Sequence, residues 1–400
     1  MRLLSIQNAC LVLSVCLASH IAGAQEYSAI KDNGPLALAG LGSFFIEGTP
    51  VEIDKSQQEP GAIGQPGRTM INQMHVQFMK PLEDGGHKPI VFVHGGGLTS
   101  KSWQTTPDGR MGWDEYFVRN GFQTFLAEQV SRGRSGFNAK EFNAVRNGVV
   151  PPAGQAAIFI PTDQLAWNNF RWGATKCTVS PCERTTELNP GIKFPVATAG
   201  VGENANHQTY NQVVPDILGS IPGSPAGCAA SPCLPTDPGG EAATPLQMAR
   251  LARDLRGAVL VGHSQSSTMP LRAALQAPAG CYPYTSAEAC NVKGIVSIET
   301  GCFENLTPAY IETLKHIPIL IVEGDFYPDE RPTAACRKMM EQINGAGGDV
   351  RFAHLPKLVA DALYPGSPGP IPGVEHMMMI GTESHKVADM LIGWLKSRNL

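Results

Sequence analysis

The chain has 400 residues, of which 42% are hydrophobic and 16% charged, and its formal net charge is −4. This length allows one large domain or two ordinary ones, and the apolar fraction is enough for a sizeable core. The small negative charge argues against a nucleic-acid-binding protein, and no basic run indicates contact with an anionic membrane surface.

Residues 1–24 have the features of a secretory signal peptide. Arg2 supplies a short positive region, residues 11–17 are apolar, and residues 22–24 (AGA) form an A-x-A cleavage site. The apolar run is too short to span a bilayer. We therefore expect a mature chain that begins at Gln25, has no membrane span and is secreted or periplasmic. The alternative is a retained N-terminal anchor.

Export changes the interpretation of the cysteines. The chain has 10 cysteines, and eight remain after the two in the signal peptide are removed. An oxidising compartment favours disulfides over free thiols or zinc ligands. Proximity in the sequence suggests the pairs Cys177/Cys182, Cys228/Cys233, Cys281/Cys290 and Cys302/Cys336.

The expected elements alternate between strand and helix on both sides of a long irregular stretch. Before it we expect strands at 42–48, 71–80, 89–93 and 122–127 and a helix at 111–120. After it we expect helices at 245–256, from 266, at 334–344 and at 385–396, and strands at 258–261, 294–298, 317–322 and 349–354. This order predicts one α/β domain over residues 25–400, with a doubly wound, mostly parallel sheet.

The irregular stretch runs from about residue 137 to residue 243. It is rich in Gly, Pro, Asn and Thr and has one expected helix, at about 163–172. A loop of this length needs a functional or topological reason. We expect a cap inserted over the carboxyl edge of the sheet.

The clearest motif is residues 261–266 (VGHSQS), which a hydrophobic strand enters and a helix follows. This is the setting of a nucleophile elbow, a tight turn that exposes a serine hydroxyl above the sheet. The small residues on either side of Ser264 are Gly262 and Ser266, so the pattern is G-x-S-x-S. The motif predicts Ser264 as a nucleophile; the alternative is an ordinary strand-to-helix turn.

Residues 94–97 (HGGG) directly follow the expected strand 89–93. Acyl transfer builds negative charge on a carbonyl oxygen, and backbone N–H groups beside bare glycines can stabilise it. We expect the N–H groups of Gly96 and Gln265 to form this oxyanion hole. The glycine spacing matches no phosphate-binding motif, and we expect neither a metal nor an organic cofactor.

A nucleophilic serine needs a base, and the base needs an orienting carboxylate. Folds with this elbow place them in the chain order Ser, acid, His. The histidines after Ser264 are His316, His354, His376 and His385. His376 lies in a Gly/Pro-rich loop after the last expected strand, from which a base can reach over the sheet edge, so we predict His376 as the base.

Two carboxylates are suited to orient this base. Glu299 ends the strand that follows the elbow, and Asp325 follows the next strand along the chain. Glu323 is less suitable because it abuts that strand. The alternative role of either residue is an ion pair or a turn cap. The residues by themselves favour Glu299 and Asp325 almost equally as the acid.

Several stretches together resemble one branch of the α/β-hydrolases, secreted bacterial esterases with a Ser-Glu-His triad. The stretches are residues 105–117 (TTPDGRMGWDEYF), 132–135 (RGRS), 263–266 (HSQS), 295–299 (IVSIE) and 376–379 (HMMM). The resemblance covers most of the chain outside the signal and part of the cap. It implies the α/β-hydrolase fold and selects Glu299 over Asp325 as the acid.

We therefore predict a serine esterase that cleaves small-molecule carboxylic esters through an acyl-enzyme intermediate. The alternatives are an acyltransferase or a peptidase on the same fold, and a catalytically silent binding protein built on it.

Overall fold

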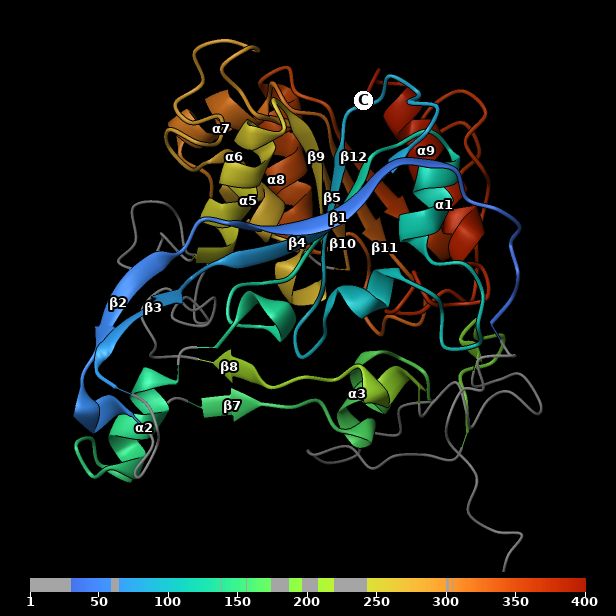
Figure 1. Cartoon of the computed structure of the whole chain (residues 1–400). Helices are drawn as coiled ribbons and strands as arrows, with labels where there is room; N and C mark the ends of the chain where they lie inside the picture. The colour runs from blue at the N-terminus through green and yellow to red at the C-terminus, as the bar shows by residue number, and fades with distance from the viewer. Residues whose placement is uncertain are drawn as a thin grey trace, which may run out of the picture.

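An eight-stranded sheet forms the centre of the computed structural model (Figure 1). The structure describes residues 30–58, 65–137, 139–155, 157–173, 187–195, 208–218, 243–299, 302–303 and 305–400. The strands, in the order in which they lie side by side, are β1 (Leu38–Ile46), β4 (Met74–Pro81), β6 (Thr124–Ala127), β5 (Ile90–Val93), β9 (Ala258–His263), β10 (Val292–Ile298), β11 (Ile319–Glu323) and β12 (Val350–His354). The β1–β4 and β4–β6 pairs are antiparallel and all others are parallel.

Burial explains why these segments differ in sequence pattern. Every residue of β5, β6, β9 and β11 is buried, so each strand is a nearly continuous apolar run. The edge strand β1 instead alternates between half-buried and exposed residues. The predicted doubly wound, mostly parallel sheet is confirmed.

Helices cover both faces of the sheet (Figure 1). One face carries α1 (Trp113–Arg119) and α9 (Ser384–Lys396), and the other carries α5 (Ala243–Asp254), α6 (Met269–Ala274), α7 (Pro308–Leu314) and α8 (Ala334–Gly345). Side chains of β5 alternate between the two cores: Phe92 packs in the first core and Val91 in the second.

Two expectations about the elements need correction. The predicted strand 71–80 is in fact the end of β3 (Gly67–Ile71), which pairs with β2 (Thr49–Ile53), followed by β4. Asn72, in the left-handed region with φ 62°, turns the chain between β3 and β4. The helix α7 was not expected from the sequence.

The strand order has a switch point in the middle of the sheet. From β5 the chain continues to β6 on one side, and from β9 it continues to β10 on the other side. Such a reversal leaves a crevice outside the carboxyl ends of the two central strands, where α/β proteins bind ligands. The loops after β5 and β9 therefore meet at this crevice.

The residues from about 137 to the start of α5 form an insertion segment. Its described elements are α2 (Lys140–Arg146), β7 (Ala157–Phe159), α3 (Asp163–Asn169) and β8 (Asp216–Leu218). β7 and β8 pair with each other in a two-stranded sheet apart from the main sheet (Figure 1). Pro161 packs against Gly97 at the carboxyl end of β5, so the segment reaches the crevice.

Two of the expected cysteine pairs, Cys281–Cys290 and Cys302–Cys336, are disulfides in the structure and are confirmed. The pairs Cys177/Cys182 and Cys228/Cys233 lie outside the described residues, as does the expected signal peptide. Among the helices that the structure describes, none has the length and apolarity that a membrane crossing requires.

Candidate active site

Ser264 follows β9 in a strained turn. Its φ of 55° lies in the left-handed region, as a nucleophile elbow requires. A Cβ atom on Gly262 would lie 2.1 Å from the carbonyl oxygen of Ser266, so only glycine fits two residues before the serine. Ser266 is buried, and its hydroxyl donates to the carbonyl of Val93 (2.9 Å) and accepts from the N–H of His263 (2.9 Å). Serine at this position therefore ties the turn to the end of β5, which explains the G-x-S-x-S pattern.

The glycine loop, residues 94–97, lies directly against the elbow. A Cβ atom on Gly95 would be 3.1 Å from Cβ of Ser264, and one on Gly96 would be 3.3 Å from the side-chain amide of Gln265. Within the described part of the chain, the N–H groups of Gly96 and Gln265 have no acceptor. Two N–H groups beside Ser264 are therefore available to a bound oxygen atom.

Asp216, at the start of β8, connects the insertion segment to the glycine loop and to the elbow. Its buried carboxylate accepts from the N–H of Gly97 (3.2 Å) and from the side-chain amide of Gln265 (2.8 Å). It also pairs with the guanidinium of Arg132. Because Asp216 occupies the N–H of Gly97, that group is not available to a substrate.

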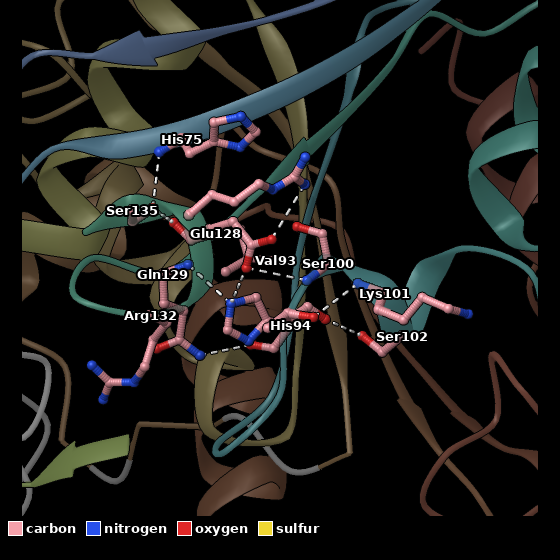
Figure 2. Close-up of polar contacts among 12 residues, drawn as sticks. His75, Val93, His94, Ser100, Lys101, Ser102, Glu128, Gln129, Arg132 and Ser135 are labelled. Atoms are coloured by element: carbon pink, nitrogen blue, oxygen red, sulfur yellow. Dashed lines mark hydrogen bonds and ion pairs between the residues drawn. The ribbon is translucent and has the colours of Figure 1, made fainter. Parts of the chain in front are cut away.

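Hydrogen bonds of the His94 imidazole hold the glycine loop in place. Its Nδ1 donates to the carbonyl of Gly95 (2.8 Å), and its Nε2 accepts from the N–H of Gln129 (3.0 Å). The side-chain amide of Gln129 donates to the carbonyl of His94 (2.7 Å), as Figure 2 shows. The carboxylate of Glu128 accepts from the N–H of Ser100 (3.3 Å) and lies 3.3 Å from His94. The end of β6 therefore supports the loop that follows β5.

His376 lies in the loop between β12 and α9. Its Nδ1 donates to Oε2 of Glu299 (2.9 Å), and its ring stacks on Phe170 with 5.0 Å between the centroids. The backbone carbonyl of His376 accepts from Nε2 of His263 (2.9 Å), the residue before Ser264. No hydrogen bond joins Ser264 to His376 among the contacts of the described residues. Such bonds are often long without substrate and tighten in the reactive complex.

Glu299 is buried at the end of β10 with a φ of 62°. Its Oε1 accepts from the N–H of Gly324 (2.7 Å), and its Oε2 accepts from the hydroxyl of Tyr327 (2.5 Å). The guanidinium of Arg171 lies 2.9 Å from the same Oε2 atom, which also accepts from His376. These four partners fix the orientation of the Glu299 carboxylate.

Asp325 has a different surrounding. Its carboxylate accepts from the N–H of Gly373 (2.8 Å) and has no contact with His376 among the described residues. The strand order gives the reason: β10, which Glu299 follows, pairs with β9 up to the residue before Ser264. Asp325 follows β11, which is one strand further away. Glu299, which the family resemblance selected over Asp325, is the one of the two carboxylates that contacts the imidazole.

Burial and charge set the ionisation states of this pair. Burial lowers the pKa of His376 below its usual value, and the hydrogen bond to Glu299 opposes this only in part. Burial would raise the pKa of Glu299, but Arg171, His376 and Tyr327 together hold it well below its usual range. At neutral pH the site therefore combines a neutral imidazole with an ionised carboxylate.

The chain is similar over most of its length to a solved bacterial esterase. The two are 32% identical with a TM-score of 0.72, and the match covers 92% of this chain and 99% of the esterase. The chain belongs to the α/β-hydrolase superfamily. A probable secreted lipase from a fungal species (strain ATCC 74256) is 51% identical over 47 residues, which is 12% of this hydrolase and 13% of the lipase. No family model matches the sequence.

Residues 105–117 are one of the segments that suggested the family. Within this segment, Arg110 anchors the loop that carries His376. The guanidinium of Arg110 donates to the carbonyls of Ile380 (3.0 Å) and Gly381 (2.9 Å) and to the hydroxyl of Ser384 (3.1 Å). These bonds join the chain before α1 to the start of α9. Arg110 therefore helps to fix the position of the histidine loop from its far end.

Several residues of the hydrolase site could not be recognised from the sequence. Arg171 and Asp216 lie in the insertion segment, where no motif marks them, and Tyr327 lies in a loop after β11. Gln129 had one weak signal, since it follows the expected strand 122–127 at the edge where functional side chains of α/β proteins gather.

Proposed function

We propose that this hydrolase is a serine esterase that cleaves small-molecule carboxylic esters. In this proposal Ser264 is the nucleophile, His376 is the general base and Glu299 orients the imidazole. The N–H groups of Gly96 and Gln265 bind the oxyanion. No metal or organic cofactor has a role in this chemistry.

The reaction begins with a proton transfer. Because Nδ1 of His376 donates to Glu299, the lone pair of the neutral ring is on Nε2, which takes the proton of the Ser264 hydroxyl. The oxygen attacks the ester carbonyl, and the two N–H groups stabilise the negative charge that develops. The imidazolium then protonates the leaving alcohol, which leaves an acyl group on Ser264.

Water completes the cycle. His376 removes a proton from a water molecule, which attacks the acyl-enzyme and forms a second oxyanion in the same N–H pair. As this intermediate collapses, the imidazolium returns its proton to the departing serine oxygen, which releases the acid and restores both Ser264 and the neutral His376. Glu299 stays ionised throughout and stabilises the imidazolium in both halves.

The observation that carries the proposal is the 2.9 Å hydrogen bond between Nδ1 of His376 and Glu299, in a loop that is bound by His263, the residue directly before a serine with a φ of 55°. A buried carboxylate on an imidazole beside a strained serine is the arrangement that activates a hydroxyl. The similarity to the bacterial esterase over 92% of the chain supports the same reaction class.

Two further features belong to this proposal. We propose that the insertion segment, about residues 137–243, is a cap over the crevice, supported by the contact between Pro161 and Gly97. We also propose that the chain is exported, supported by its two disulfides and by the partial match to a probable secreted lipase. Export predicts few or no free thiols in the folded mature protein. Reaction of most of the eight remaining cysteines with a thiol reagent would contradict it.

The direct test combines a covalent probe with a panel of esters. A fluorophosphonate should label the wild-type protein at Ser264, and p-nitrophenyl esters of increasing acyl length should be hydrolysed. S264A should fold, escape labelling and lose at least about 10³-fold in turnover. Near-wild-type turnover in a folded S264A protein would overturn the assignment.

The same materials separate the rival functions. A catalytically silent binding protein would neither be labelled nor release product. An acyltransferase would pass the acyl group to an added alcohol rather than to water, and a peptidase would cleave peptide substrates in preference to esters.

A further inference from the structure

Three consecutive residues of the insertion segment contact the base and the carboxylates beside it. The ring of Phe170 stacks on the imidazole of His376 with 6° between the planes, and its carbonyl accepts from the backbone N–H of His376 (3.3 Å). The indole of Trp172 donates to the buried carboxyl group of Glu375 (3.2 Å). Arg171 lies between them with a φ of 61°. These residues of the insertion segment therefore line the site beside the base.

Arg171 is held in place on three sides. Its Nε donates to the carbonyl of Asp325 (2.7 Å), and its guanidinium lies over the ring of Tyr327, 3.9 Å from the centroid. Its Nη2 atom is 2.9 Å from Oε2 of Glu299, and only 9% of the side chain is exposed. A buried cation so close to a carboxylate is only weakly screened by solvent. Its charge therefore acts on the pair formed by Glu299 and His376.

Among the described residues, Glu299 and four other titratable or charged groups lie around His376. Glu299, directly after β10, is ionised, His263 on β9 is buried and neutral, and Arg171 in the insertion segment is the nearby cation. The hydroxyl of Tyr327 donates to the same Oε2 atom of Glu299, and Glu375 precedes the histidine in the chain. Without Arg171, the negative charge of Glu299 would act on the imidazole without compensation. A proton on His376 would then be more favourable in the resting enzyme.

We propose that Arg171 is a positioning residue that holds the Glu299 carboxylate in line with His376 and keeps the resting imidazole neutral. This inference rests on the proposed esterase function. Arg171 touches no reacting atom; it acts through Glu299. The insertion segment thereby contributes directly to the base, because residues 170–172 contact His376, Glu375 and Glu299 and one of them carries the cation.

The test measures the rate of fluorophosphonate labelling of Ser264 as a function of pH. In the wild type this rate should fall as His376 gains a proton. Removal of the cation in R171Q should move the midpoint of this acid limb upward by about one pH unit, since a charge at such a distance shifts a pKa by that order. R171K should give an intermediate midpoint, because a lysine cannot contact both Glu299 and the carbonyl of Asp325 in the fork geometry of arginine.

R331Q is the matched control. The Arg331 guanidinium also lies over the ring of Tyr327 (3.4 Å) and is buried, but in the described structure it pairs with Glu323 and not with Glu299. The midpoint of R331Q should equal that of the wild type. A merely structural role for Arg171 would lower the melting temperature of R171Q without a shift of its midpoint.

Each outcome decides the proposal. A folded R171Q with the wild-type midpoint overturns it, and so does an equal shift in R331Q. If R171Q does not fold, R171K takes its place: a raised midpoint supports the proposal and a wild-type midpoint overturns it. Failure of the wild-type protein to react would instead overturn the esterase function, and this inference with it.

Discussion

The imidazole of His263 donates a hydrogen bond from Nε2 to the backbone carbonyl of His376 (2.9 Å), so the residue before the nucleophile holds the segment that carries the base. Burial, together with the nearby His376, lowers the pKa of His263 to about 3. His263 is therefore neutral across the range in which the enzyme would work, and its single Nε2–H donor points at the histidine loop. The distance between the elbow and the loop is thus set by groups that do not titrate near neutral pH.

The acid of the proposed triad is tested by a pair of isosteric variants. We expect E299Q to lose on the order of 10⁴-fold in turnover, because the amide cannot stabilise the imidazolium as a carboxylate does. D325N should keep most of its activity, since Asp325 holds the backbone of Gly373 and makes no contact with His376 within the described structure. Turnover of both folded variants on one p-nitrophenyl ester provides the measurement. The reverse order of activities would show that Asp325 is the acid.

The pH dependence of the wild-type enzyme follows from the buried imidazole. Burial lowers the pKa of His376, so the base stays unprotonated to a lower pH than a free histidine, whose pKa is about 6.5. The acid limb of kcat/KM should therefore have its midpoint below pH 6.5, when measured with an ester that does not itself ionise. A midpoint at or above that value would mean that the charge of Glu299 outweighs the burial of the imidazole.

The elbow predicts a sharp contrast between two glycine-to-alanine changes. In G262A the new Cβ atom would lie 2.1 Å from the carbonyl oxygen of Ser266, so the turn must open. We expect a loss of about 3 kcal/mol or more in the free energy of unfolding, together with loss of fluorophosphonate labelling. At Gly345 in α8 nothing lies within 4 Å of the added atom. G345A should therefore be neutral or more stable by up to about 1 kcal/mol in urea denaturation, and equal stability of the two variants would refute the packing argument.

Glu375 should make the protein less stable as the pH rises. Burial raises the pKa of this carboxyl group to about 8, whereas in the unfolded chain it is about 4.3. Between these values the folded protein keeps a proton that the unfolded chain releases, so this group lowers the free energy of unfolding progressively across that window. A glutamine mimics the neutral acid and can still accept from Trp172 and from the N–H of Met377.

E375Q should therefore match the wild type in stability near pH 4 and exceed it at pH 8. Urea denaturation of both proteins at the two pH values measures the difference. A stability difference that is the same at both pH values would mean that Glu375 is ionised in the folded state.

The sequence by itself determined the sheet and the central motif of this protein. Buried parallel strands must be apolar on both faces, so β5, β9 and β11 stand out as continuous hydrophobic runs. The elbow around Ser264 also depends on local sequence, because the carbonyl oxygen of Ser266 excludes a side chain at Gly262, only four residues earlier. These features need no knowledge of distant contacts.

Only the tertiary structure gives the physical reason why Glu299 meets the imidazole. Glu299 and Asp325 both follow strands, and in the sequence only the family resemblance favoured Glu299; the pairing of β10 with β9 brings Glu299 beside the elbow. Arg171 and Asp216 show no sequence signal at all, since each acts on residues that are distant in the chain. Their contacts depend on how the insertion segment packs against the crevice, and irregular chain has no periodicity from which such packing can be predicted.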